Sequence, residues 1–229
     1  VVTDAELSEL LMRAFILRRV ALISNHLGDA VVLGSRHCAK TLGIREFLER
    51  NGHPYLYLDV EQDEGARALV ERFQIGPHDI PVLICRGTKV LRAPSNAEVA
   101  DCLGFNAGIS TDAVRDIVVV GAGPAGLSAA VYAASEGLDV LVLESNAPGG
   151  QAGSSSKIEN YLGFPTGISG QALAGRAFTQ AQKFGAEVAI ASEAARLDCS
   201  GTPYVVELQN GHRIRARSVV IATGAEYRK

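Results

Sequence analysis

Hydrophobic residues recur at helical spacing near the start of the chain. Asp4 is a suitable N-cap, and the apolar positions behind it predict a helix that ends near Arg18 and Arg19. These apolar positions are Leu7, Leu10, Leu11, Ala14, Phe15 and Leu17. We interpret this helix, within an N-terminal lead-in at 1–29, as an element that packs on a neighbouring domain. A membrane-surface helix is the weaker alternative, because the polar face is mixed in sign.

From Ala30 to residue 104, short apolar runs alternate with amphipathic helical patterns. The expected elements are a strand at 30–33, a helix at 39–51, a strand at 55–60, a helix at 65–73, strands at 80–84 and 89–91, and a helix at 96–103. This βαβαββα order predicts an α/β domain at 30–104. The first two strands should be parallel, and the last two should form an antiparallel hairpin because only a short turn separates them.

A second α/β pattern opens at Asp116, and we expect it to define a domain at 116–229. Residues 105–115 have no sustained apolar period, which predicts a linker. Apolar runs at 116–120 and 140–143 predict buried strands on either side of a helix. Further along, alternating polarity around Asn210-Gly211 predicts a hairpin of strands 204–208 and 213–216, which we interpret as scaffolding.

Three glycines follow the strand at 116–120, at the start of the expected helix. Gly121 permits a tight turn, Gly123 lets the backbone approach a pyrophosphate, and Gly126 allows the helix to pack on the strand. The helix N-terminus would then face the phosphate charge. Glu144 ends the next strand about 20 residues beyond the glycines, where a carboxylate accepts ribose hydroxyls. The pattern predicts a dinucleotide site, and a phosphate-free turn is the alternative.

Composition narrows the class of protein further. The 229 residues are 47% hydrophobic and 21% charged, which is typical of a globular chain with room for two modest domains. A net charge of -3 and a pI near 6.0 offer no basic surface for nucleic acid or an anionic membrane. Neither a signal peptide nor an apolar run long enough to span a bilayer is present in the sequence.

The four cysteines are scattered, with no CxxC pair and no histidine at metal-ligand spacing. They are Cys38, Cys85, Cys102 and Cys199. We therefore expect neither a disulfide framework nor a metal site, and a reducing, cytoplasmic setting. The chain begins at Val1 and stops at Lys229 just after an apolar strand pattern, so we expect it to be part of a longer polypeptide.

The first domain resembles the thioredoxin/glutaredoxin family. The resemblance rests on Ser35-Arg36-His37-Cys38-Ala39-Lys40-Thr41 between the first strand and helix, and on Ile80-Pro81 before the third strand. In that family these are the thiol site and the cis-proline that faces it. The second thiol of the usual CxxC is Thr41 here. Cys38 would lie at a helix N-terminus among basic side chains, which favours a thiolate. Monothiol redox chemistry and a non-catalytic docking or regulatory module both remain open.

The second domain resembles the N-terminal, FAD-binding part of the thioredoxin reductase family. The matching motifs are Gly121-Ala-Gly-Pro-Ala-Gly126, Gly149-Gly150-Gln151, Ile158-Glu159-Asn160-Tyr161-Leu-Gly-Phe-Pro165, Gly185-Ala-Glu-Val188 and Ile221-Ala-Thr-Gly-Ala225. The resemblance implies a Rossmann-type fold and FAD as cofactor. The cofactor-binding residues that it implies are Gly121, Gly123, Pro124, Ala125, Gly126, Glu144, Ser145, Gly150, Gln151, Asn160, Val188, Ala222, Thr223 and Gly224.

The resemblance also implies an activity. The parent protein would pass electrons from NADH or NADPH through FAD to a redox protein or small disulfide, as a homodimer. The family's nicotinamide domain, its CxxC and the segment that returns to the flavin are not in this sequence. We therefore expect no turnover with NADPH by the isolated chain. The domain order resembles bacterial fusions in which a cyclic-nucleotide-binding-like domain comes first. A redox-inactive nucleotide-binding or regulatory module is the alternative.

Overall fold

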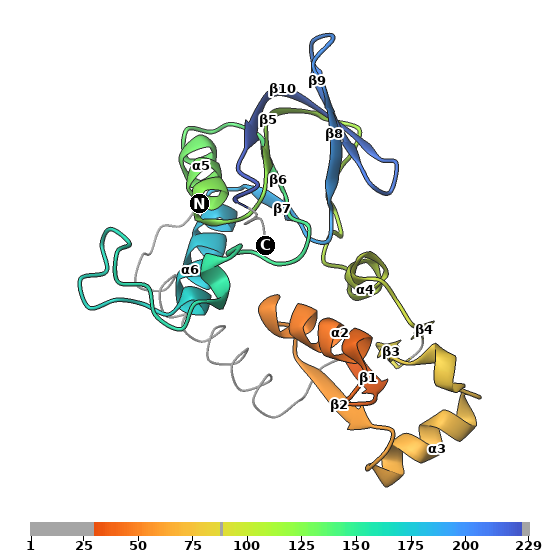
Figure 1. Cartoon of the computed structure of the whole chain (residues 1–229). Coiled ribbons are helices and arrows are strands. Elements are labelled where there is room, and N and C mark those ends of the chain that lie inside the picture. Colours follow the sequence, from red (N-terminus) through yellow and green to blue (C-terminus); the bar gives the residue numbers. More distant parts are fainter. Residues whose placement is uncertain (1–29, 88, 226–229) are drawn as a thin grey trace, which may run out of the picture. The chain divides into compact units, whose positions relative to one another are not determined.

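The computed structural model describes residues 30–87 and 89–225, so the helix expected between Asp4 and Arg19 lies outside the described residues. The chain divides into two compact units between Leu103 and Gly104, each with its own sheet (Figure 1). No helix in the described ranges is long and apolar enough to cross a membrane.

The first unit is a four-stranded sheet with helices, and its element order is the predicted one. Its elements are β1 (Ala30–Gly34), α2 (Ala39–Arg50), β2 (Tyr55–Asp59), α3 (Glu64–Arg72), β3 (Val82–Cys85), β4 (Lys89–Arg92) and α4 (Asn96–Leu103). The strand order is β2-β1-β3-β4. β1 runs parallel to β2 and antiparallel to β3, and β3 and β4 form the hairpin. The predicted parallel pair and hairpin are confirmed.

The core of the first unit explains its element types. All four residues of β3 are buried, as expected of a central strand with a continuous apolar sequence. A buried cluster joins β1 and β3 to α3 and consists of Leu33, Ala66, Ile75, Val82 and Ile84. Helix α2 buries Ile44, Phe47 and Leu48 at helical spacing. This packing holds the start of α2, of which the candidate thiol Cys38 is the N-cap, next to the end of β1.

The expectation of no disulfide is wrong for the first unit. Cys85, at the end of β3, and Cys102, in α4, form a disulfide whose Cα atoms are 6.4 Å apart. No disulfide was predicted, because a separation of 17 residues carries no pairing signal of its own. The pair forms because α4 packs its buried side chains, Val99, Ala100 and Leu103, against the unit. Cys38 and Cys199 are free thiols.

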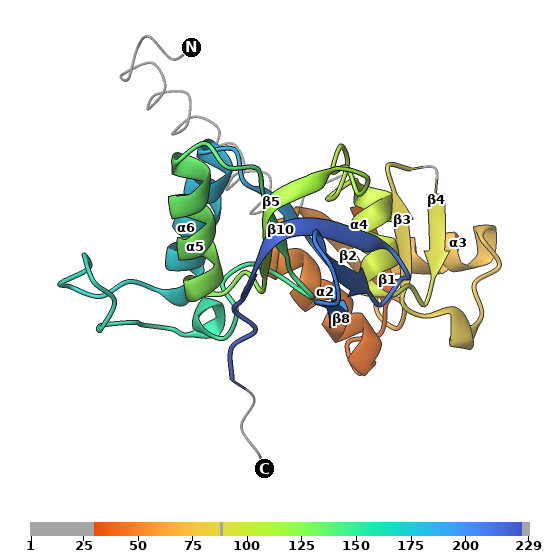
Figure 2. The same ribbon diagram turned by 90° about the horizontal axis from the view of Figure 1, so that it is seen from above.

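The second unit is built on a six-stranded sheet. Its elements are β5 (Val114–Val120), α5 (Pro124–Ser135), β6 (Val140–Leu143), α6 (Gly170–Lys183), β7 (Glu187–Ala189), β8 (Ala194–Asp198), β9 (Tyr204–Leu208) and β10 (Arg213–Ile221). The strand order is β7-β6-β5-β10-β9-β8. The first four strands of that order are parallel, which confirms the Rossmann-type parallel sheet. Helices α5 and α6 lie side by side (Figures 1 and 2).

Strand β10 joins two kinds of pairing in this sheet. Its first residues pair antiparallel with β9, and from Arg215 to Ile221 it runs parallel to β5. The predicted hairpin around Asn210-Gly211 is confirmed. The three strands β8, β9 and β10 are antiparallel neighbours, but they extend the parallel sheet instead of forming a separate one. Through β10 the hairpin supports the strand that carries the glycine loop.

The stretch expected as a linker, 105–115, is anchored to the second unit. Asn106 accepts a hydrogen bond from the Ile190 N–H at 2.8 Å and donates one to the Ile190 carbonyl at 2.9 Å. Arg115, whose side chain is 5% exposed, lies 2.8 Å from Asp139 and 2.6 Å from Glu187. These acidic groups belong to the region just before β6 and to β7, so Arg115 links three neighbouring segments of the sheet.

Candidate dinucleotide-binding site

Two of the three motif glycines are required by close packing of the backbone. Gly121 follows β5 with φ of +104°, and a Cβ there would overlap the carbonyl oxygen of Ala222. A Cβ on Gly126, in the first turn of α5, would overlap the carbonyl oxygen of Gly121 and lie 3.3 Å from Val119 Cγ1. Any side chain at either position would push the strand, the turn and the helix apart.

Gly123 is different, and this difference points to a ligand. Its φ of −72° and ψ of −177° are accessible to any residue. A Cβ on Gly123 would meet nothing within 4 Å. The fold itself therefore does not need glycine here. Open space at this point of the loop is what a pyrophosphate needs in order to approach the backbone.

The N-terminus of helix α5, with its partial positive charge, lies directly after Gly123. Gly123 is the N-cap of α5, and no side chain caps the helix. The first N–H groups of a helix have no intrahelical acceptor, and the helix dipole makes this end attractive to anions. Pro124 at the first position removes only an N–H that would be unpaired anyway. The open face of Gly123 and an uncapped helix end thus fit a dinucleotide phosphate.

Glu144 holds the other side of this loop. It directly follows β6 and is 7% exposed. One carboxylate oxygen accepts the Ala122 N–H at 2.8 Å, and the other accepts the Asn146 N–H at 2.8 Å. A carboxylate has about four acceptor sites, so two further hydroxyl groups can still donate to it. The ribose contact of Glu144 stays a prediction, and the contact of its carboxylate with the glycine loop is not evident from the sequence.

Two further loops close on the glycine loop. The Gly149 N–H donates to the Ala122 carbonyl at 2.7 Å. A Cβ on Gly150 would lie 3.2 Å from Gly123 Cα. Gln151 donates from Nε2 to the Ala225 carbonyl at 2.6 Å, which ties its loop to the turn after β10. The structure therefore places Gly150 beside Gly123, Gly121 beside Ala222, and Gln151 beside the turn after β10.

The other predicted residues lie in the same loops or in β7, and most of them are exposed. Ala125 lies in the first turn of α5, and Thr223 and Gly224 lie in the turn after β10; all three are exposed. Ser145 is exposed beside Glu144, and Asn160 is exposed in the loop that precedes α6. Val188 is buried in β7, where it pairs with Val142.

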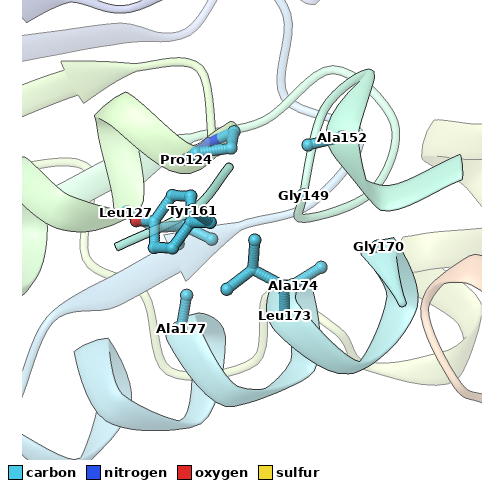
Figure 3. A pocket seen from close by; sticks show the side chains of 9 residues that line it. All are labelled: Pro124, Leu127, Gly149, Ala152, Tyr161, Gly170, Leu173, Ala174 and Ala177. Atoms are coloured by element: carbon cyan, nitrogen blue, oxygen red, sulfur yellow. The ribbon is translucent and has the colours of Figure 1, made fainter. Parts of the chain in front are cut away.

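Helix α6 packs against α5 next to the glycine loop, and no helix is predicted at these residues from the sequence. Figure 3 shows Leu173, Ala174 and Ala177 of α6 facing Leu127 of α5 and Tyr161 across a small apolar cavity. The cavity has a volume of about 10 Å³, roughly the space of one water molecule, so it is a packing gap. Its other lining residues are Pro124, Gly149, Ala152 and Gly170. A signal for α6 is Ser169, whose side chain caps the helix by accepting the Ala172 N–H.

The candidate thiol Cys38 belongs to the first unit. It is the N-cap of α2, half-buried, and its N–H donates to the Ser35 carbonyl at 3.0 Å. The pKa of the Cys38 thiol is lowered, chiefly by the backbone N–H of Thr41 and then by the Thr41 hydroxyl, with a smaller contribution from Lys40. The Thr41 hydroxyl is fully buried, and its oxygen makes no hydrogen bond of ordinary geometry in the part of the chain that the structure describes. The Ile80–Pro81 peptide bond is cis.

Within residues 30–87 and 89–225, no three His, Cys, Asp or Glu side chains gather in a way that could hold a metal ion.

The parallel sheet, the glycine loop at the end of β5 and the carboxylate at the end of β6 have the arrangement typical of Rossmann-type dinucleotide-binding domains. The family model for pyridine nucleotide-disulphide oxidoreductases matches residues 115–229. The chain belongs to this family.

Individual proteins with similar sequences include thioredoxin reductases. The chain is 40% identical to a thioredoxin reductase of Bacillus subtilis (strain 168) over 121 residues, which are 53% of this chain and 37% of the relative. It is 30% identical over 157 residues to NADPH-dependent thioredoxin reductase 3 of Arabidopsis thaliana, covering 62% of this chain and 29% of that protein. The chain thus spans 37% of the first relative and 29% of the second.

Two solved structures are also similar to part of this chain. The thioredoxin reductase of Streptococcus pyogenes MGAS5005 is 38% identical, with a TM-score of 0.48, over 52% of this chain and 38% of that one. A thioredoxin reductase from Gloeobacter violaceus is 35% identical, with a TM-score of 0.46, over 50% of this chain and 36% of that one.

Proposed function

We propose that the second unit binds FAD and that the protein is a flavin-dependent oxidoreductase similar to thioredoxin reductase. The observation that carries this proposal is Gly123. The fold tolerates a side chain there, yet the position is glycine, and it faces open space at an uncapped helix N-terminus. Membership of the pyridine nucleotide-disulphide oxidoreductase family supports the choice of a flavin dinucleotide.

The chain's own residues would hold the adenosine diphosphate half of the cofactor. The N–H groups of the first turn of α5 would donate to the pyrophosphate, and Glu144 would accept the adenosine ribose hydroxyls with its remaining lone pairs. The Gly150–Gln151 loop and the turn at Ala222–Gly224 would lie towards the flavin side. Bound FAD would supply the transfer of electrons from reduced nicotinamide to a disulfide or another acceptor.

We further propose that the first unit is a thioredoxin-like module. The order β2-β1-β3-β4 and the position of Cys38 at the N-terminus of α2 support this interpretation. The lowered pKa of Cys38 favours a thiolate, so this residue is the candidate for receiving electrons. Thr41 stands where a second thiol would be, so no disulfide can form within this motif. A docking module that positions a partner is the second candidate, and Thr41 favours it.

The experiment that tests FAD binding is a visible absorption spectrum of the purified chain after incubation with excess FAD and removal of free cofactor. We expect a retained flavin band. Gly123→Ala should lose this band, and its matched control is Gly175→Ala in α6. A Cβ at either position meets nothing within 4 Å, but Gly175→Ala should retain as much flavin as the wild type. A spectrum without flavin in the folded wild type would contradict the proposal.

Addition of NADPH or NADH without oxygen separates the two kinds of function in a longer polypeptide that also carries a nicotinamide-binding domain. Bleaching of its flavin would support an oxidoreductase. A flavin that such a polypeptide retains, but that neither nucleotide bleaches, would favour a redox-inactive binding module.

A further inference from the structure

The disulfide between Cys85 and Cys102 has no part in the proposed FAD site. It links the last residue of β3 to the last turns of α4, and the Cα separation of 6.4 Å lies in the ordinary range for a disulfide. Helix α4 ends at Leu103, directly before the chain enters the second unit. The bond therefore fastens the last helix of the first unit to the central part of its sheet.

The strand register separates this pair from Cys38. Cys85 pairs with Ala30, the first residue of β1, whereas Cys38 follows Gly34, the last residue of that strand. A five-residue strand spans about 13 Å at roughly 3.3 Å per residue. The two thiol sites thus lie at opposite ends of the sheet. Cys38 is too far away to attack the disulfide in its own folded unit, so any reductant must come from outside.

The two sulfur atoms are not equally open to attack. The Cys85 side chain is 1% exposed, whereas Cys102 is only partly buried. A thiolate from solution can approach Cys102, while the surrounding core shields Cys85. Exchange should therefore begin at the sulfur of Cys102.

We propose that Cys85–Cys102 is a reversible thiol-disulfide exchange site that takes low-molecular-weight thiols as its reductant. The thiolate of a first small thiol bonds to Cys102 Sγ, the Cys85–Cys102 bond breaks, and Cys85 leaves as a thiolate that takes up a proton. A second small thiolate attacks the small-molecule sulfur of this mixed disulfide and releases Cys102, which is also protonated. The protein gains two electrons and two protons, and the small thiols become a disulfide. A low-molecular-weight disulfide drives the reverse reaction.

Reduction should loosen α4 without unfolding it. The helix keeps its buried Val99 and Leu103, and Arg86 donates from Nη2 to the Leu103 carbonyl at 3.1 Å. At its start, Ser95 and Glu98 are joined by hydrogen bonds from the Ser95 N–H and hydroxyl to the carboxylate. What is lost is the crosslink that closes a segment of 17 residues, which restrains the unfolded chain. The thermal midpoint of the first unit should then fall by on the order of 10 °C.

The test is a redox titration of the whole chain in its native state. The protein is equilibrated in mixtures of reduced and oxidised glutathione, alkylated with iodoacetamide and analysed by peptide mass spectrometry. We expect Cys85 and Cys102 to change together from unlabelled to labelled as the mixture becomes more reducing, and to return when oxidised glutathione is restored. The Cys38→Ser variant should give the same curve. Pairing that yields only after denaturant is added, or thiols that stay labelled in the most oxidising mixture, would overturn the proposal.

Two single variants test the order of attack. With oxidised glutathione, Cys85→Ser should accumulate one glutathione on Cys102. Cys102→Ser should leave Cys85 unmodified, because its sulfur is buried. Equal modification of Cys85 and Cys102 in the two folded variants would contradict the asymmetry. Thermal unfolding of oxidised and reduced wild type measures the loosening without any substitution.

Discussion

Replacing Gly123 by alanine should abolish tight FAD binding while the protein stays folded. The added Cβ meets nothing within 4 Å, and the backbone at φ −72° and ψ −177° is open to alanine. Alanine is a poorer N-cap than glycine, which costs about 0.5–1 kcal/mol, and it restricts the unfolded chain, which gains about 0.4–1 kcal/mol. The free energy of unfolding should therefore change by less than about 1 kcal/mol.

The effect on the cofactor should be far larger than the effect on the fold. The methyl group would occupy the space through which a pyrophosphate reaches the loop. We expect the dissociation constant for FAD to rise at least tenfold, which corresponds to about 1.4 kcal/mol or more. Fluorescence titration with FAD measures the affinity, and urea unfolding of the same preparation measures the stability.

Gly126→Ala is the contrasting variant. Its Cβ would overlap the Gly121 carbonyl, so overpacking should cost about 1–3 kcal/mol of folding free energy. Gly175→Ala controls for the glycine-to-alanine change alone, since it lies in α6 with open space around it. If folded Gly123→Ala binds FAD as tightly as the wild type, the assignment of this space to the pyrophosphate is refuted.

Three further outcomes follow from the contacts. Glu144→Gln removes the charge that accepts the Ala122 and Asn146 N–H groups, so it should cost about 1–3 kcal/mol in urea unfolding and weaken FAD binding; unchanged stability would contradict the role of Glu144 in the loop. Arg115→Ala should cost about 2–3 kcal/mol because its hydrogen bonds to Asp139 and Glu187 are lost, whereas the exposed Arg217→Ala should cost no more than about 1 kcal/mol; equal losses would refute the ranking. Because the pKa of Cys38 is lowered, its alkylation rate should reach half its maximum at a pH below that of an ordinary thiol, and Thr41→Val should move this pH upward; an unmoved profile would exclude the Thr41 hydroxyl as a cause.

Local patterns were sufficient to predict the elements that carry the glycine loop. The run of β-branched residues at 117–120 followed by glycines is typical of a buried strand that leads into a turn and a helix. The Gly121 turn and α5 lie where the pattern predicts them, whereas β5 begins at Val114, within the predicted linker. The elements of the first unit could be predicted equally well, because its strands are short, apolar and separated by amphipathic helices. In both cases the period of the hydrophobic residues matches the period of the secondary structure.

What the sequence could not show depends on contacts between distant segments. Helix α6 was missed because its glycines, Gly170 and Gly175, weaken the local helical signal, although Ser169 caps it. Glycine is needed at Gly170 because a Cβ there would overlap the Ala152 carbonyl, which becomes evident only once the loop has folded. The Cys85–Cys102 pair and the Gln151–Ala225 hydrogen bond are likewise tertiary. The contact of Glu144 with the glycine loop could not be predicted for the same reason, since its backbone partner, Ala122, lies in the loop after another strand.

The central claim is that the glycine loop and Glu144 bind the adenosine diphosphate half of FAD. An equilibrium titration of the wild-type chain with FAD, followed by competition with ADP and with riboflavin 5′-phosphate, tests it most directly. We predict saturable binding of one FAD per chain, displacement by ADP and little displacement by riboflavin 5′-phosphate. Absence of saturable FAD binding, or displacement by riboflavin 5′-phosphate but not by ADP, would contradict the account.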